Sequence, residues 1–134
     1  MSFEWNEDLT TGIAKIDNQH KEIFGQLNVL LDAMDKGKGR EEIDQVLAFL
    51  ENYVATHFRD EERFMSEHSY DGLPLQRIEH SRFIKDFYYL KNELLQCGST
   101  LHVVVKVEQV LGNWLINHIK VEDKKMAVAL KMVA

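Results

Sequence analysis

Apolar residues recur at intervals of three and four along four stretches of the chain. Residues at these intervals lie on one face of a helix, so each stretch predicts an amphipathic helix that buries a single stripe. A shorter segment precedes the first stretch, and another follows the last. The pattern predicts an N-terminal arm at 1–15, helices at roughly 17–36, 40–67, 74–96 and 100–118, and a C-terminal segment at 119–134.

The connections between these stretches are short and rich in turn residues. They contain Gly37-Lys38-Gly39, Asp71-Gly72-Leu73-Pro74 and Gly98-Ser99-Thr100. Pro74 suits a first helical turn, and Thr100 after Gly98 resembles an N-cap that follows a C-terminal glycine. The run Val103-Val104-Val105 is more typical of a strand, but the helical spacing around it outweighs this signal. Because short connections place consecutive helices antiparallel, the sequence predicts an all-α, up-down-up-down four-helix bundle.

Composition narrows the class of protein further. The 134 residues are 45% apolar and 28% charged, which suits a single domain at 1–134 with its own core. A formal net charge of -6 argues against binding to nucleic acid or to an anionic membrane. The single cysteine, Cys97, excludes an internal disulfide, and the chain has neither a signal-peptide pattern nor an apolar run long enough to span a membrane. We therefore expect a cytoplasmic protein. We also expect a monomer, because no exposed apolar stripe remains that would require a partner.

Polar residues occupy positions that the helical pattern reserves for apolar side chains. Burying such groups costs several kcal/mol unless a partner satisfies them. All four predicted helices contribute to this set, which comprises His20, His57, Glu61, Gln76, His80 and His118.

The spacing of these residues indicates which of them share a face. His57 and Glu61 are four residues apart, as are Gln76 and His80, so each pair points in one direction. His118 and Asp123 are five apart, roughly 140° around an ideal helix. Both can face the core only if the backbone breaks between them.

Each feature also has a structural interpretation. A single core histidine is more often hydrogen-bonded than metal-bound, and a His/Glu pair four apart is common on solvated faces. Convergence of the whole set on one interior favours a metal site instead, and imidazole with carboxylate suits Zn, Mn or Fe. The sequence contains no His-Glu-x-x-His motif, phosphate-binding glycine loop or cysteine cluster, and no Glu-x-x-His of the ferritin type.

The segments around these residues resemble a bacterial hemerythrin over essentially the whole chain. They read Ile16-Asp17-Asn18-Gln19-His20, His57-Phe58-Arg59-Asp60-Glu61-Glu62, Glu79-His80 and Trp114-Leu115-Ile116-Asn117-His118, with Asp123 beyond. The resemblance implies a non-haem di-iron centre in which Glu61 and Asp123 bridge two irons together with an oxo or hydroxo group. His20 and His57 would hold the iron with an open position, and His80 and His118 the other iron. The family's further histidine, four residues before His80, is replaced by Gln76.

The implied function is O2 binding for storage, delivery or sensing, with O2 held as peroxide at the open iron position, rather than catalysis. Phe58, Trp114, Leu115 and Ile119 would line the oxygen pocket. Gln76 could coordinate through its amide oxygen, give its place to water, or leave the iron five-coordinate. The alternative function is a di-iron redox enzyme that acts on peroxide or nitric oxide at the extra open position left by Gln76. A sensor would need an output domain, which we do not find in this sequence.

Overall fold

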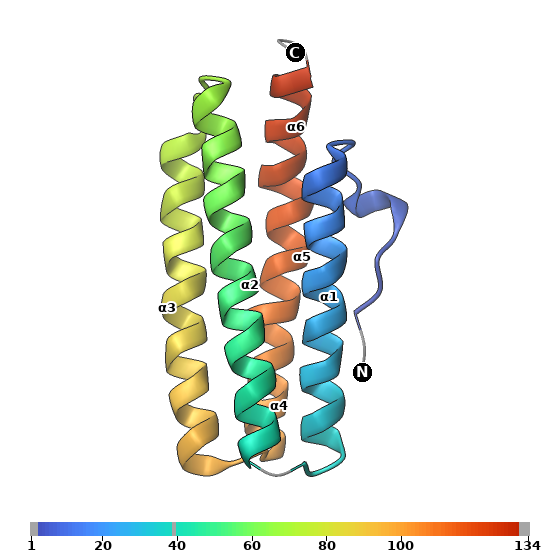
Figure 1. The fold of residues 1–134 in the computed structure, drawn as a ribbon, viewed down its shortest axis with the longest axis vertical. Helices are drawn as coiled ribbons and strands as arrows, with labels where there is room; N and C mark the ends of the chain where they lie inside the picture. The colour runs from blue at the N-terminus through green and yellow to red at the C-terminus, as the bar shows by residue number, and fades with distance from the viewer. Residues whose placement is uncertain (1–2, 39, 132–134) are drawn as a thin grey trace.

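The computed structural model describes residues 3–38 and 40–131, and it is an up-down-up-down bundle of four antiparallel helical rods (Figure 1). The predicted all-α bundle is therefore confirmed, and no strand occurs in the described ranges. None of the helices within them is long and apolar enough to cross a membrane. The elements are η1 (Glu7–Leu9), α1 (Ala14–Asp35), α2 (Arg40–Glu67), α3 (Leu73–Cys97), α4 (Leu101–Lys106), η2 (Val107–Asn113), α5 (Trp114–His118), η3 (Ile119–Asp123) and α6 (Lys124–Lys131).

The turns carry the residues that their backbone conformations require. Gly98 ends α3 with φ of +75°, a conformation that glycine adopts without steric cost. Thr100 caps α4, because its side chain accepts a hydrogen bond from the Val103 amide at 3.2 Å. Pro74 lies in the first turn of α3, where its missing N–H has no helical partner to lose. These local signals separate the rods at the expected places.

The fourth rod continues where the sequence analysis ended it. Residues 119–131 are helical, and the rod runs without interruption from α4 to α6. Two of its segments, η2 and η3, are π-helical, with hydrogen bonds between residues five apart instead of four. The backbone between His118 and Asp123 therefore widens rather than breaks. The outermost parts of the expected arm and C-terminal segment, residues 1–2 and 132–134, and Gly39 of the first turn lie outside the described residues.

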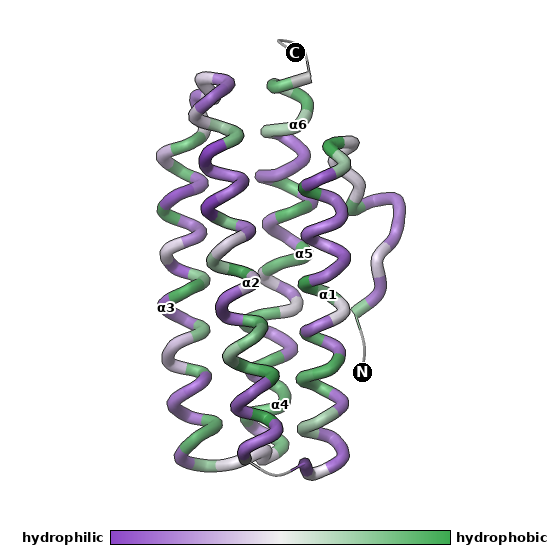
Figure 2. The backbone as a smooth tube through the Cα atoms, in the orientation of Figure 1, coloured by the Kyte–Doolittle hydropathy of each residue, from purple (hydrophilic) through white to green (hydrophobic). Residues whose placement is uncertain are grey.

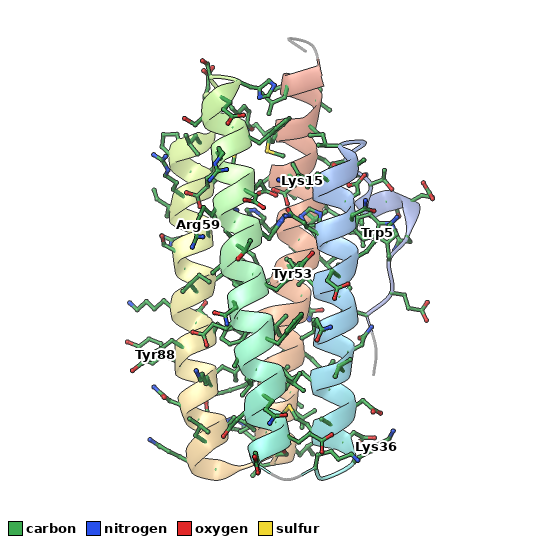
Figure 3. The ribbon with its side chains drawn as sticks, viewed as in Figure 1. Trp5, Lys15, Lys36, Tyr53, Arg59 and Tyr88 are labelled. Atoms are coloured by element: carbon green, nitrogen blue, oxygen red, sulfur yellow. The ribbon has the colours of Figure 1, made fainter. Side chains whose placement is uncertain are left out.

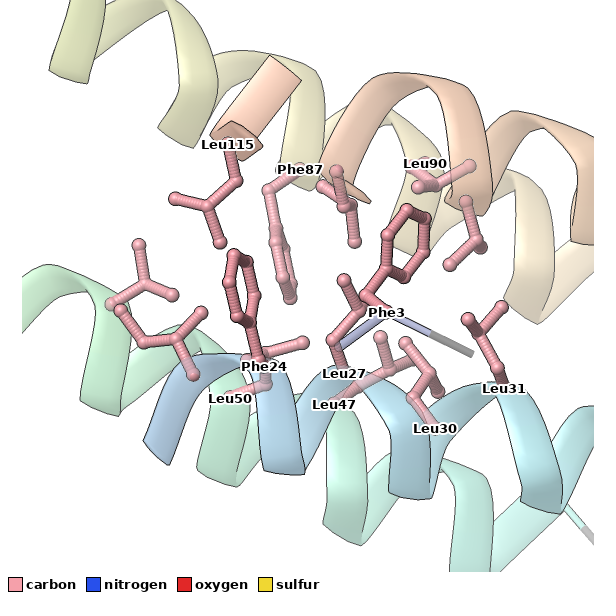
Figure 4. Packing of buried hydrophobic residues seen from close by; sticks show 14 of the residues in the cluster. Phe3, Phe24, Leu27, Leu30, Leu31, Leu47, Leu50, Phe87, Leu90 and Leu115 are labelled. Atoms are coloured by element: carbon pink, nitrogen blue, oxygen red, sulfur yellow. The ribbon is translucent and has the colours of Figure 1, made fainter. Parts of the chain in front are cut away.

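The interior is apolar over most of its length. Apolar and polar residues alternate along every rod with helical periodicity (Figure 2). The largest cluster extends from Met34, Ile43 and Leu94 near the α1–α2 and α3–α4 turns to Phe58 and Ile119. Figure 4 shows the packing of part of it. A second, smaller cluster lies towards the opposite end and includes Ile16, Met65, Met126 and Leu130.

The N-terminal arm, residues 3–13, is bound along α1. The backbone of Phe3 exchanges two hydrogen bonds of 2.7 Å with the side chain of Asn28. Its ring enters the apolar cluster beside Gly112, where a Cβ would overlap it (Figure 4). Near the start of α1, the carboxylate of Asp17 accepts hydrogen bonds from Thr11 and Gly12. The arm is thus part of the fold and reaches both the apolar cluster and the first helical turn.

Candidate metal centre

All of the residues expected at the metal site are buried. They come from every rod, so only the assembled bundle brings them together. Their exposed fractions are 0% for His20, 1% for His57, 1% for Glu61, 0% for Gln76, 2% for His80, 4% for His118 and 1% for Asp123.

Glu61 lies between two groups of imidazoles. Its Oε2 is 3.2 Å from Nε2 of His57 and 3.7 Å from Nε2 of His20. Its other oxygen, Oε1, is 3.2 Å from Nε2 of His80. The potential ligand atoms of His20, His57 and Glu61 lie within 4.8 Å of one another, as do those of Glu61, His80 and His118. One carboxylate is therefore shared by two possible metal positions.

Asp123 has the same arrangement on the opposite side. Its Oδ2 is 3.2 Å from Nε2 of His20, and its Oδ1 is 3.3 Å from Nε2 of His118. Gln76 donates from Nε2 to the same Oδ1 at 3.1 Å. The centre thus has a His20 side, formed by His20 and His57, and a Gln76 side, formed by Gln76, His80 and His118. Each carboxylate turns one oxygen to each side.

The π-helical turn η3 explains how two residues five apart meet. In an ideal α-helix, Asp123 would point roughly 140° away from His118. Hydrogen bonding from i to i+5 underwinds the backbone and brings these two positions to the same face. Both side chains are consequently buried and in contact. A single widened turn supplies Asp123 to the centre while leaving the rod continuous.

The nitrogen and oxygen atoms of this centre are arranged to bind a cation rather than to hydrogen-bond with one another. Buried polar atoms almost always have a hydrogen-bond partner, yet several atoms here have none within the described part of the chain. Most of these atoms lie beside one another at the centre, where Nε2 of His20, His80 and His118 is 3.2–3.7 Å from an oxygen of Glu61 or Asp123 but without hydrogen-bond geometry. They include both ring nitrogens of His20, Nε2 of His80 and of His118, both oxygens of Glu61, Oε1 of Gln76 and Oδ2 of Asp123. Imidazole nitrogen with carboxylate oxygen is a donor set for iron.

The pKa values in the metal-free chain show the same need for positive charge. Burial by itself lowers the pKa of His20, but Asp123 and Glu61 outweigh it and raise that pKa to about 9. Asp123 likewise raises the pKa of His118 against the effect of burial. Burial would raise the pKa of Glu61, but the imidazoles, His57 first, hold it well below its usual range. The raised pKa values of His20 and His118 favour protons on these two rings beside the carboxylates, and a metal ion would displace such protons.

The outer nitrogens of two histidines are hydrogen-bonded to residues that the residue pattern did not single out. Nδ1 of His57 donates to Oε1 of Gln19 at 2.7 Å. Nδ1 of His80 donates to Oε2 of Glu62 at 2.9 Å. Such bonds fix the orientation of the ring and leave the lone pair of Nε2 free to bind a cation at the centre.

A third partner, Glu79, has its Oε2 3.4 Å from Nδ1 of His118. Gln19, Glu62 and Glu79 (the Nδ1 partners) each adjoin a site residue on one rod and contact an imidazole of the next rod. The signal in the sequence is a polar residue beside each inward-pointing ligand. The imidazole that this polar residue contacts lies on another rod, and the local sequence pattern does not predict which one.

Aromatic rings cover the Gln76 side. Phe58 stacks on His80 with centroids 3.9 Å apart and 5° between the planes. Trp114 stacks on His118 at 4.7 Å and 8°. Leu115 and Ile119 are fully buried in the apolar cluster that includes Phe58. Of the expected pocket, the two aromatic residues therefore stack on imidazoles of the Gln76 side.

The His20 side has a different cover. Trp5 of the arm lies beside α1, with its ring centroid 6.2 Å from that of His20 and 5.9 Å from that of Phe24 (Figure 3).

A surface hollow lies next to the Gln76 side. Its volume is about 420 Å³, it lies between α2 and α3, and its lining includes Phe58, Glu62 and His80. Surface access thus approaches the centre next to His80.

Comparison with known proteins places this arrangement in a family. Residues 11–130 match the family model described as the hemerythrin HHE cation binding domain. A bacteriohemerythrin of Pseudomonas paraeruginosa is 35% identical over 119 residues, which are 89% of this chain and 75% of that protein. A bacteriohemerythrin of Stenotrophomonas maltophilia is 33% identical over 132 residues, or 95% of this chain and 80% of that protein.

More distant comparisons agree. The hemerythrin subunit alpha of Lingula anatina is 30% identical over 123 residues, covering 92% of this chain and 91% of that one. A crystal structure of a leucine-to-phenylalanine mutant superposes with a TM-score of 0.83, 27% identity and 96% coverage of both chains. The chain therefore belongs to the hemerythrin family, and it is a di-iron, oxygen-binding protein.

Proposed function

We propose that this protein binds O2 at an open iron position on the His20 side of the centre. The observation that carries the proposal is the pair of shared carboxylates, each with one oxygen towards either side. Glu61 and Asp123 would be shared by the two irons. His20 and His57 would hold one iron, and His80 and His118 would hold the other, with Gln76 beside it.

When bound, the iron pair would supply the electrons that reversible O2 binding requires, and the protein's own residues control what surrounds the bound O2. The His20 side has two imidazoles and two carboxylate oxygens, which leaves room for a small ligand. Phe58 and Trp114 stack on His80 and His118, and with the buried Leu115 and Ile119 they would form an apolar wall on the Gln76 side that limits the entry of water and protons. Such a wall slows irreversible oxidation by withholding the protons that the leaving reduced oxygen requires.

Metal analysis combined with absorption spectroscopy tests this proposal. The full chain is loaded with ferrous iron without oxygen, and its spectrum is followed on exposure to O2 and on O2 removal. We expect close to two irons per chain and a spectral change that reverses. Failure to take up iron, or a change that never reverses, contradicts reversible oxygen binding.

Gln76 supports a second candidate function, a redox enzyme acting on peroxide or nitric oxide. Its amide is fully buried, and its Oε1 has no hydrogen-bond partner in the described ranges. An amide oxygen holds ferrous iron less well than imidazole does. The neighbouring His80 lies at the hollow between α2 and α3. A second open position on this side would admit small molecules.

Replacing Gln76 with histidine separates the two functions. Gln76→His should supply a third imidazole, so we expect iron content to hold or rise and the O2 adduct to live longer. Azide should then bind with a simpler stoichiometry, because one entry position is closed. Titration with azide and the autoxidation rate measure this. Unchanged iron content, azide binding and autoxidation would show that Gln76 has no part in the chemistry.

The monomeric state and the cytoplasmic location stay predictions. Sedimentation of the iron-loaded protein and cell fractionation check them.

A further inference from the structure

The two sides of the centre differ in what stands behind their histidines. On the Gln76 side, Nδ1 of His80 meets the carboxylate of Glu62 at 2.9 Å, and Nδ1 of His118 meets that of Glu79 at 3.4 Å. On the His20 side, Nδ1 of His57 meets the neutral amide of Gln19. Nδ1 of His20 has no partner in the described part of the chain. In the described part of the chain, carboxylates thus contact outer imidazole nitrogens directly on the Gln76 side, whereas on the His20 side the nearest carboxylate, Asp60, is separated from His57 by the amide of Gln19.

Position and burial make these contacts more than surface ion pairs. Oε2 of Glu79 is buried and has no hydrogen-bond partner within the described ranges, so its nearby polar group is the His118 ring. Glu62 is held from its other oxygen, which accepts a hydrogen bond from Nε of Arg77 at 3.3 Å. Glu62 is therefore hydrogen-bonded to the outer nitrogen of His80, and Glu79 places a buried carboxylate oxygen 3.4 Å from that of His118, within ion-pair distance but without hydrogen-bond geometry.

A carboxylate behind a metal-binding imidazole makes that ring a stronger donor. The N–H shifts electron density into the ring as it bonds to the negative oxygen, and the opposite nitrogen becomes more basic. The Gln76 side is the side that lacks a histidine and offers an amide in its place. The stronger donors and the weaker ligand therefore occur on the same iron.

We infer that Glu62 and Glu79 are positioning residues that strengthen His80 and His118 and so retain iron on the side where Gln76 replaces a histidine. The inference rests on the proposed di-iron function. On that side, two imidazoles that each have a carboxylate at the outer nitrogen take the place of three imidazoles without one. On the His20 side the free coordination position is the one that O2 occupies, so no missing protein ligand has to be compensated there.

Charge-neutral, equally sized variants test this inference. Glu62→Gln keeps an oxygen that accepts the ring N–H of His80, Glu79→Gln keeps an oxygen beside the His118 ring, and both remove the negative charge. Glu51→Gln is the matched control, since Glu51 pairs with Lys91 at 3.1 Å on the same face of the bundle, ten residues along α2 from Glu61. We measure the affinity of each iron by chelator competition, the reduction potential, and the melting temperature of the metal-free protein.

We expect the affinity of one iron to fall about 10- to 100-fold in Glu62→Gln and Glu79→Gln, with a higher reduction potential and an unchanged second iron. Glu51→Gln should match the wild type within twofold. Adding Gln76→His to Glu62→Gln should restore the lost affinity, because a third imidazole replaces the missing charge. A role in folding alone would not produce this rescue.

A complementary variant moves the charge to the other side. Gln19 donates from Nε2 to Asp60 at 2.9 Å, so the double variant Gln19→Glu/Asp60→Asn exchanges amide and carboxylate at unchanged net charge. It should strengthen the iron on the His20 side and lower the reduction potential.

The outcomes distinguish this inference from the proposed function. If the wild type binds two irons and Glu62→Gln behaves like Glu51→Gln, the inference is overturned while the proposed function stands. If the wild type takes up no iron, both are overturned. Selective loss of one iron with rescue by Gln76→His supports both.

Discussion

The two parts of the bundle interior are built from opposite kinds of side chain. The apolar end, between the α1–α2 and α3–α4 turns, contains Leu30, Leu47, Leu50 and Leu94, each at most 4% exposed. Burying such side chains stabilises the fold by roughly 1.5–3 kcal/mol each. The metal centre buries imidazoles and carboxylates just as fully, and this costs free energy until their charges are balanced. One region therefore holds the helices together, and the other depends on what binds there.

The arm links these two regions. Phe3 enters the apolar cluster, and Trp5 lies beside His20. The comparison predicts that changes at the apolar end affect stability with and without iron alike. Changes at the centre should affect mainly the difference between the two forms.

Glu61→Gln should produce the largest effect. Glu61 is the carboxylate that faces both sides, and an amide cannot offer a negative oxygen to two cations. We expect iron to fall from about two per chain to nearly none, and the melting temperatures with and without added iron to coincide. Iron analysis and circular dichroism measure this. Retention of two irons would contradict the bridging position of Glu61.

Leu50→Ala is the matching change at the apolar end. Leu50 lies on the same helix as Glu61 and is 2% exposed. Truncation should cost about 2–5 kcal/mol of unfolding free energy, because the cavity remains only partly filled. We expect the same loss in the metal-free and iron-loaded proteins, with iron per folded chain unchanged. A loss confined to the iron-loaded form would show that the two regions are not separate.

The stability of the metal-free protein should depend on pH in a direction set by His20. Its pKa is raised from 6.5 to about 9 in the folded chain, so the contribution is complete below pH 6.5 and disappears as the pH rises through 9. A pKa shift of this size corresponds to about 3 kcal/mol in the free energy of unfolding. Iron binding releases protons and is favoured by the same rise in pH. The difference in melting temperature between the two forms should therefore widen from pH 6 to pH 9.

Thermal unfolding at several pH values, with and without iron, measures this divergence. The variant His20→Gln is the control, since it removes the main titrating ring and should flatten the metal-free profile. A metal-free protein that gains stability between pH 6.5 and 9 would refute the charge balance described for the centre.

Gly112→Ala should have the smallest effect and act on the link between the regions. A methyl group at Gly112 would overlap the Phe3 ring and displace it, at a cost of about 1–3 kcal/mol. Hydrogen exchange along residues 3–11 should become faster, with iron content unchanged. Gly25→Ala is the control, because a Cβ there has nothing within 4 Å and should stabilise α1 by about 0.5–1 kcal/mol. Equal exchange in the two variants would mean that Phe3 does not anchor the arm.

Much of this molecule can be derived from residue spacing. The interval of three and four predicts the rods, and the interval of four places His57 with Glu61 and Gln76 with His80. The interval of five between His118 and Asp123 could not be resolved in this way, because an ideal α-helix separates them. The π-helical turn that joins them depends on hydrogen bonds that residue order alone does not specify.

The sequence by itself determined the all-α bundle, the short turns and the set of polar residues that the helices turn inwards. These features follow from periodicity, which acts within one helix at a time. The tertiary structure alone decided which carboxylate oxygen faces which imidazole, which side Phe58 and Trp114 cover, and that Gln19, Glu62 and Glu79 each support a histidine of the next rod. Those contacts join residues on different helices, so they depend on the rotation and axial position of packed rods, which packing sets after each helix is formed.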